Sequence, residues 1–191
     1  MRSLFLFLLL AGPALASPGE TLTLHGEARI AGETRPVRFT FLCSSHDGPQ
    51  VTGAQMTGVM GVDLIVPRHD TLRPIFDFDP FEGPDARAGA LTRLETTAEA
   101  ASGSLSAMVS GSIGVEDDAP FVFSAVAARR RDAARLAELA RVLAPLTTGP
   151  AQLSWTQGQT RAGAASIAAQ LEVSAADAER LKGFLAPCLG R

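Results

Sequence analysis

The sequence predicts an α+β fold that is mainly antiparallel β. About seven or eight strands form a sandwich or a curved sheet, with two helices near residues 131–144 and 174–187. Three observations support this prediction. Many segments alternate apolar and polar residues with the period of two that is typical of half-buried strands. The two helical segments carry apolar residues at intervals of three and four. Turn-forming residues gather between the periodic segments.

Residues 1–16 have the pattern of a secretory signal peptide. Arg2 precedes an apolar run at residues 4–11, which is too short for a bilayer that needs roughly 20 apolar residues. Ala14 and Ala16 provide small side chains at a cleavage site, so residues 17–191 are expected as one mature β-rich domain. The alternatives are an uncleaved anchor and a buried N-terminal helix. We expect a periplasmic or secreted protein that is soluble after cleavage, with no membrane span.

Composition and charge indicate where the protein is located and which classes of partner it can bind. The chain has no Asn and no Tyr, and it is rich in Arg, Ala and Gly, a bias that a GC-rich bacterial genome produces. The periplasm is therefore the expected location of the protein. The net charge is −3, and loss of Arg2 with the signal makes it −4. An acidic chain without a basic field argues against nucleic acid as a partner.

The first two strands are expected to form a hairpin. Residues 21–30 alternate clearly, residues 31–34 are turn-like, and residues 37–43 alternate again. In the second strand Arg38 and Thr40 fall on one face and apolar side chains on the other. This hairpin is expected to have one face toward the core and one toward water.

Six further segments have strand character. They lie at residues 59–66, 91–98, 104–113, 121–128, 151–155 and 167–173. The second, third and fourth of these predict an antiparallel meander. Trp155 is the only Trp, and it alternates with Leu153, so we expect it in the core.

The two predicted helices have recognisable ends. Asp132 and Ser174 are suitable N-caps, and Ser174 begins a sequence that resembles a capping box. Pro145 and Pro187 are expected to end the helices, because proline lacks the backbone N–H that a helix interior needs.

Cys43 and Cys188 are the only cysteines. In an oxidising compartment two cysteines most simply form one disulfide. The alternative is a reactive thiol, although no C-x-x-C pair is present. A disulfide would place the C-terminal helix beside the second strand.

Residues 67–85, called here the recognition segment, are the candidate binding site. Four prolines exclude a helix and a central strand. Charges and aromatic residues are interleaved, as recognition loops require. The candidate binding residues are Arg68, His69, Asp70, Arg73, Asp77, Asp79, Glu82 and Asp85.

Other interpretations of this segment remain open. The acids at 77, 79, 82 and 85 could bind calcium through oxygen ligands, although their spacing does not fit an EF-hand loop. Carboxylates near His69 could serve a hydrolase. The segment could also be a surface loop whose phenylalanines pack inward while its acids are solvated.

Standard catalytic signatures are absent from the sequence, which lacks H-E-x-x-H, G-x-S-x-G, P-loop and C-x-x-C patterns. We expect a non-catalytic exported binding or interaction protein whose recognition segment meets an envelope protein or a cationic ligand. No cofactor or bound metal is expected. The alternative function is a carboxylate- and histidine-dependent hydrolase that uses the same segment.

Overall fold

The computed structural model of the protein describes residues 21–44, 58–68, 72, 76–77, 85–113, 119–128, 132–158 and 165–190. The strands within these ranges are β1 (Thr21–Ile30), β2 (Glu33–Ser44), β3 (Val59–Val66), β4 (Phe76–Asp77), β5 (Asp85–Ala98), β6 (Ser102–Ile113), β7 (Phe121–Ala128), β8 (Ala151–Gln157) and β9 (Ile167–Val173). The helices are α1 (Ala133–Leu143), the short 3-10 helix η2 (Ala144–Thr147) and α2 (Ala175–Leu189). The predicted α+β class is confirmed.

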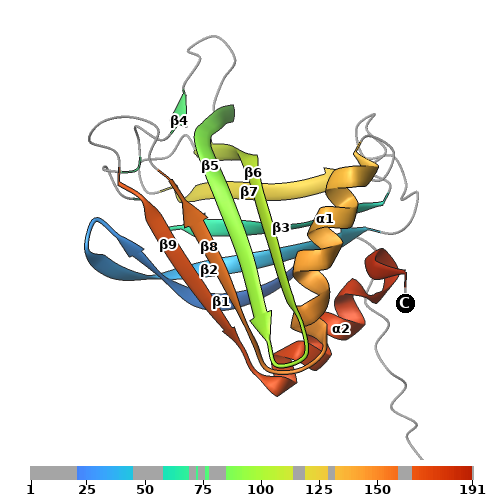
Figure 1. The fold of residues 1–191 in the computed structure, drawn as a ribbon. Helices are drawn as coiled ribbons and strands as arrows, with labels where there is room; N and C mark the ends of the chain where they lie inside the picture. Colours follow the sequence, from blue (N-terminus) through green and yellow to red (C-terminus); the bar gives the residue numbers. More distant parts are fainter. Residues whose placement is uncertain are drawn as a thin grey trace, which may run out of the picture.

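The strands form one antiparallel sheet that closes on itself (Figure 1). Its order is β5-β6-β7-β3-β2-β1-β9-β8, and β8 pairs back with β5. The remaining strand, β4, is two residues long and pairs with β5 alone. The curved sheet, and not the sandwich, is therefore the correct form. The predicted meander is present as β5, β6 and β7.

Four strands, β1, β3, β7 and β9, begin and end where the alternation predicts. The first hairpin turn is shorter than expected, because Ala31 and Gly32 alone form it, with φ of 50° and 89°. Two consecutive positive φ values are typical of the tight turns whose twist matches that of the flanking strands. Strand β5 begins at Asp85 instead of residue 91, and residues 85–87 are already paired with β6.

The inward faces of the strands form a continuous apolar core. The largest side chains in it are almost completely buried: Phe39, Phe41, Phe121, Phe123 and Trp155. The expectation that Trp155 belongs to the core is confirmed. Eight strands close around a space that such side chains can fill, which explains how the aromatic residues stabilise the closed form.

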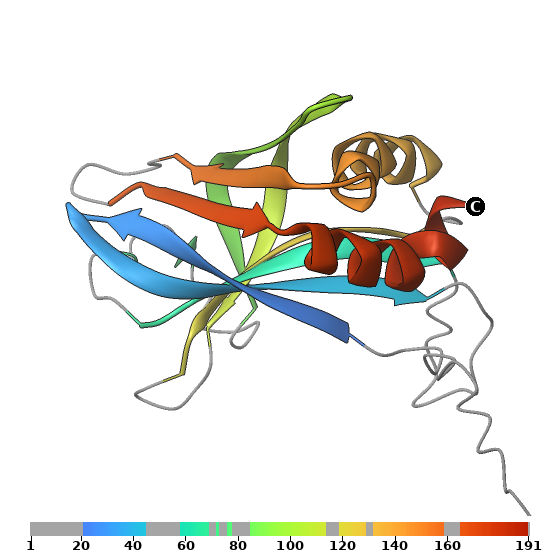
Figure 2. The same cartoon turned by 90° about the horizontal axis from the view of Figure 1, so that it is seen from below.

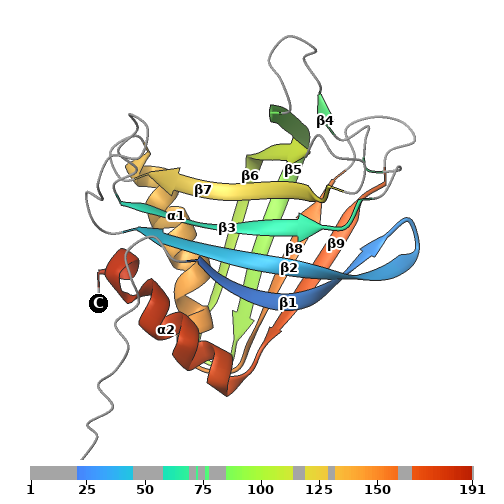
Figure 3. The same ribbon diagram turned by 180° about the vertical axis from the view of Figure 1, so that it is seen from behind.

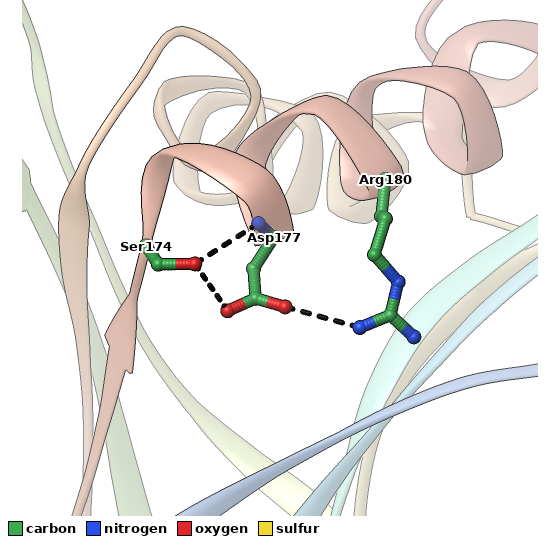
Figure 4. A network of polar contacts seen from close by, with 3 residues as sticks. All are labelled: Ser174, Asp177 and Arg180. Carbon is green, nitrogen blue, oxygen red and sulfur yellow. Dashed lines mark hydrogen bonds and ion pairs between the residues drawn. The ribbon is translucent and has the colours of Figure 1, made fainter.

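Side-chain caps begin both helices. The Asp132 carboxylate accepts a hydrogen bond from the backbone N–H of Arg135 at 3.0 Å. At the start of α2 the Ser174 hydroxyl accepts from the Asp177 backbone N–H at 3.1 Å and donates to its carboxylate at 2.6 Å (Figure 4). This hydrogen bond from Ser174, assisted by Arg180, lowers the pKa of the Asp177 carboxyl. Both predicted N-caps are confirmed.

The predicted disulfide is present. Cys43 and Cys188 are joined, with their Cα atoms 5.9 Å apart. Helix α2 consequently lies beside the end of β2 (Figures 2 and 3). Helix α1 packs against β6 and β7. The disulfide thus connects the C-terminal helix to the first hairpin, as the sequence predicts.

The prediction for the end of α2 is wrong. Pro187 lies inside the helix, which continues to Leu189 and ends at Gly190 with a φ of 70°. A proline this close to the end removes only one backbone donor, and the disulfide at Cys188 holds the last turn in place. Pro145 behaves as predicted, since α1 stops at Leu143 and Pro145 enters η2.

Candidate functional site

The recognition segment is described at only a few positions. Arg68 follows β3, and the backbones of Asp77 and Asp85 lie in β4 and at the start of β5. The other predicted binding residues, His69, Asp70, Arg73, Asp79 and Glu82, lie outside the described residues. The hydrolase and calcium interpretations depend on groups in that set, so their geometry is not described.

Two contacts fix the recognition segment to the closed sheet. Leu72 is completely buried and belongs to the apolar core. Phe76 and Asp77 pair with Ala88 and Arg87 of β5. The sequence suggests phenylalanines as the inward-packing residues of this segment, and the contribution of Leu72 is not predicted. Its apolar side chain in the polar stretch between Asp70 and Arg73 is the signal that could have identified this anchor.

The position of β4 follows from the pairing of Arg87. This residue pairs with Ser110 of β6 on one side and with Asp77 of β4 on the other. Strand β4 therefore occupies the same edge of β5 that β8 occupies further along, between residues 92 and 98. Because β8 ends at Gln157, β4 lies just beyond that end of the closed sheet (Figure 1).

The interior is polar where β8 ends. Thr92 and Gln157 are paired across β5 and β8, both are completely buried, and the Thr92 hydroxyl donates a hydrogen bond to the Gln157 side-chain oxygen. Two residues earlier on β8, the indole N–H of Trp155 is buried and has no hydrogen-bond partner among the residues that the structure describes. A buried donor of this kind usually finds a partner, and water can supply it.

A groove on the outer face of the sheet, called here the outer groove, begins at the first residue of the recognition segment, Pro67. Its volume is about 360 Å³. It is lined by His25, Pro36, Val37, Arg38, Ile65, Pro67 and Pro120.

Strand register explains how these residues meet. His25 of β1 pairs with Arg38 of β2, and Arg38 pairs with Ile65 of β3. The three side chains form one row across neighbouring strands. If the β2–β3 and β3–β7 registers are continued past their last pairs, the prolines at positions 36, 67 and 120 fall opposite one another. They form the next row on the same face of the sheet. The groove lies between these two rows.

The basic groups of the outer groove are available for a ligand. His25 and Arg38 are exposed, and neither side chain is engaged in a hydrogen bond or ion pair within the described part of the chain. Two acids lie one row away in the strand pattern, Glu27 on β1 and Asp63 on β3, and Asp63 is hydrogen-bonded to Ser124. Burial raises the pKa of the Asp63 carboxyl, and the Ser124 hydrogen bond opposes that effect.

A second cleft lies between the start of β6 and the end of α1. It has a volume of about 390 Å³, and its polar side chains are Ser102, Ser104, Arg141 and Thr148. Gly103 brings β6 close to α1 here, because a Cβ at this position would collide with the backbone of Arg141 and Val142.

Over the described ranges, no three His, Cys, Asp or Glu side chains group in a way that could hold a metal ion. Neither is there, in those ranges, a helix with the length and apolar character needed to cross a bilayer. No protein-family model matches the chain, and searches of curated proteins and solved structures found no significant match.

Proposed function

We propose that this chain is an exported, non-catalytic binding or interaction protein, and that the recognition segment is its binding surface. The observation that carries the proposal is the double attachment of this segment at Leu72 and β4. Binding residues commonly lie on irregular segments that a rigid scaffold positions, and here the scaffold is the closed sheet.

The charge of the segment suggests the chemistry of its target. Five of its eight candidate residues are acidic: Asp70, Asp77, Asp79, Glu82 and Asp85. Such a surface favours a cationic ligand or the basic patch of an envelope protein. The segment's prolines reduce the conformational entropy that it would lose on binding.

Export to the periplasm is the second part of the proposal. It is supported by the signal-like pattern of residues 1–16 and by the disulfide between Cys43 and Cys188. Disulfides form and persist in oxidising compartments and are rare in the cytosol of mesophiles.

The test is a pull-down from periplasmic extract with the wild type and with the double variant Asp77→Ala/Asp79→Ala. The matched control removes two exposed acids elsewhere, as Glu99→Ala/Glu179→Ala. We expect the control to retain a partner that the Asp77/Asp79 variant loses, and we expect this binding to weaken with added salt. Equal recovery of every partner by the three proteins would refute the assignment of the segment as the binding surface.

A further inference from the structure

We propose that the outer groove binds the carboxylate of a small organic acid with a short apolar body. This inference goes beyond the proposed function and does not depend on it. The acids of the recognition segment favour cationic targets, whereas the groove presents His25 and Arg38 and favours an anionic group.

Arg38 provides the charge. Arg38 lines the groove, and its guanidinium has no acidic partner in the described residues. Guanidinium groups bind carboxylates through two parallel hydrogen bonds, which are stronger than hydrogen bonds between neutral groups. His25 is directly opposite on β1 and offers an N–H in either protonation state. The two side chains can therefore donate to one carboxylate.

The other lining residues of the outer groove are suited to the apolar part of the ligand. Ile65 continues the row of Arg38, and three proline rings form the adjacent row. Proline rings have few conformations to lose, so this wall is largely formed before a ligand arrives. A ligand with a charged head at Arg38 and a hydrocarbon tail along the prolines matches both rows.

The size of the groove favours a small molecule over a protein. Its volume of about 360 Å³ lies within the range of roughly 300–1,000 Å³ that is common for small-ligand sites. Protein interfaces usually include a broad apolar patch. In the described part of the chain Val126 is the one large apolar side chain that is exposed, and it does not line the groove.

Nearby acids do not cancel this preference. Glu27 pairs with Pro36 across β1 and β2, but it does not line the groove and makes no ion pair with Arg38 in the structure. Asp63 lies in the row on the other side, where its carboxylate is bonded to Ser124. Of the fully charged side chains, only Arg38 is part of the described lining.

Octanoate is a suitable probe, with 1-octanol and octylamine as uncharged and cationic controls. Binding to the wild type is measured by titration calorimetry and mapped by chemical-shift changes in NMR spectra. We expect saturable binding of octanoate, with shifts centred on His25, Arg38 and Ile65. Octanol and octylamine should bind at least about tenfold more weakly, since each lacks the charge-assisted hydrogen bonds with Arg38.

The decisive variant is Arg38→Gln, and the matched control is Arg29→Gln. Arg29 is also exposed on the outer face of β1 but lies outside the groove. We expect Arg38→Gln to weaken octanoate binding about tenfold or more and Arg29→Gln to change it less than about twofold. Melting curves establish that both variants fold.

Four results would each overturn the proposal: no saturable octanoate binding, equal effects of the two variants, octanol binding as tightly as octanoate, or chemical-shift changes centred on another surface. Asp77 and Asp79 do not take part in octanoate binding. A failed pull-down would therefore leave the octanoate proposal intact, and a failed octanoate titration would leave the proposed function intact.

Discussion

Removing the disulfide should lower the free energy of unfolding by an amount that follows from the length of the loop it closes. The double variant Cys43→Ser/Cys188→Ser eliminates the bond without leaving a free thiol. The two cysteines are 145 residues apart in the sequence. For a loop of that length, the chain-entropy treatment gives a loss of about 5 kcal/mol in the free energy of unfolding. Native disulfides typically contribute about 2–5 kcal/mol, so we expect a loss within that range.

The variant should still fold, because α2 has other attachments. Ala178, Leu181 and Leu185 are buried against the core, whereas Cys188 and Leu189 in the last turn are only partly buried. The disulfide holds that last turn on β2. We therefore expect hydrogen exchange to accelerate most in the final turn of α2, on top of the global loss of stability.

The assay is urea denaturation of the wild type, the double variant and the wild type under reducing conditions. The reduced wild type serves as the control, since it loses the bond but keeps both sulfur atoms. A double variant with an unfolding free energy within about 1 kcal/mol of the oxidised wild type would refute the reasoning. Free thiols at both positions in the exported protein, detected by mass spectrometry, would refute the premise.

Two further predictions concern stability. Gly103→Ala should lower the free energy of unfolding by about 1–3 kcal/mol, because its Cβ would collide with the carbonyl of Arg141. Gly183 lies in α2 with open space around it, so Gly183→Ala should raise the free energy of unfolding by roughly 0.5–1 kcal/mol. Urea denaturation of the two variants measures both changes, and equal effects would contradict the packing argument. The raised pKa of Asp63 means that the folded state holds its proton more tightly than the unfolded state, whose value is near 3.8. The free energy of unfolding should therefore fall as pH rises from that value through the folded pKa. Asp63→Asn should remove this fall and should be the more stable protein at neutral pH. Denaturation curves measured across this pH range would give parallel profiles for the two proteins if the idea is wrong.

The hairpin that carries His25 and Arg38 is implicit in the sequence, but its register is not. The expected four-residue turn at residues 31–34 would place His25 opposite Thr40, whereas the two-residue turn at Ala31 and Gly32 places it opposite Arg38. Ile65 and Pro120 could not be placed from the sequence either. Their positions depend on the pairing of β3 with β2 and with β7. Pairing between strands separated by long connections is not encoded in any local pattern.

The recognition segment shows the same limit. The prediction that its prolines exclude a central strand agrees with the described positions Phe76 and Asp77, where β4 is only two residues long and pairs with β5 alone. The burial of Leu72 follows from the position of the core beneath it, which alternation along the chain does not reveal. Residues 85–90, which are mostly small, carry a weak strand signal and become part of β5 through pairing with β6 and β4.

The sequence by itself determined the class of the fold, the main strands, both N-caps and the pairing of the cysteines. These features depend on the period of apolar residues, on side chains within a few positions of each helix start, and on there being only one pair of sulfur atoms. Tertiary structure alone decided that the sheet closes through β5 and β8, where β4 attaches, and which side chains face one another in the outer groove. The reason is that β ladders join residues far apart in the chain, and their register is selected by packing of the whole core.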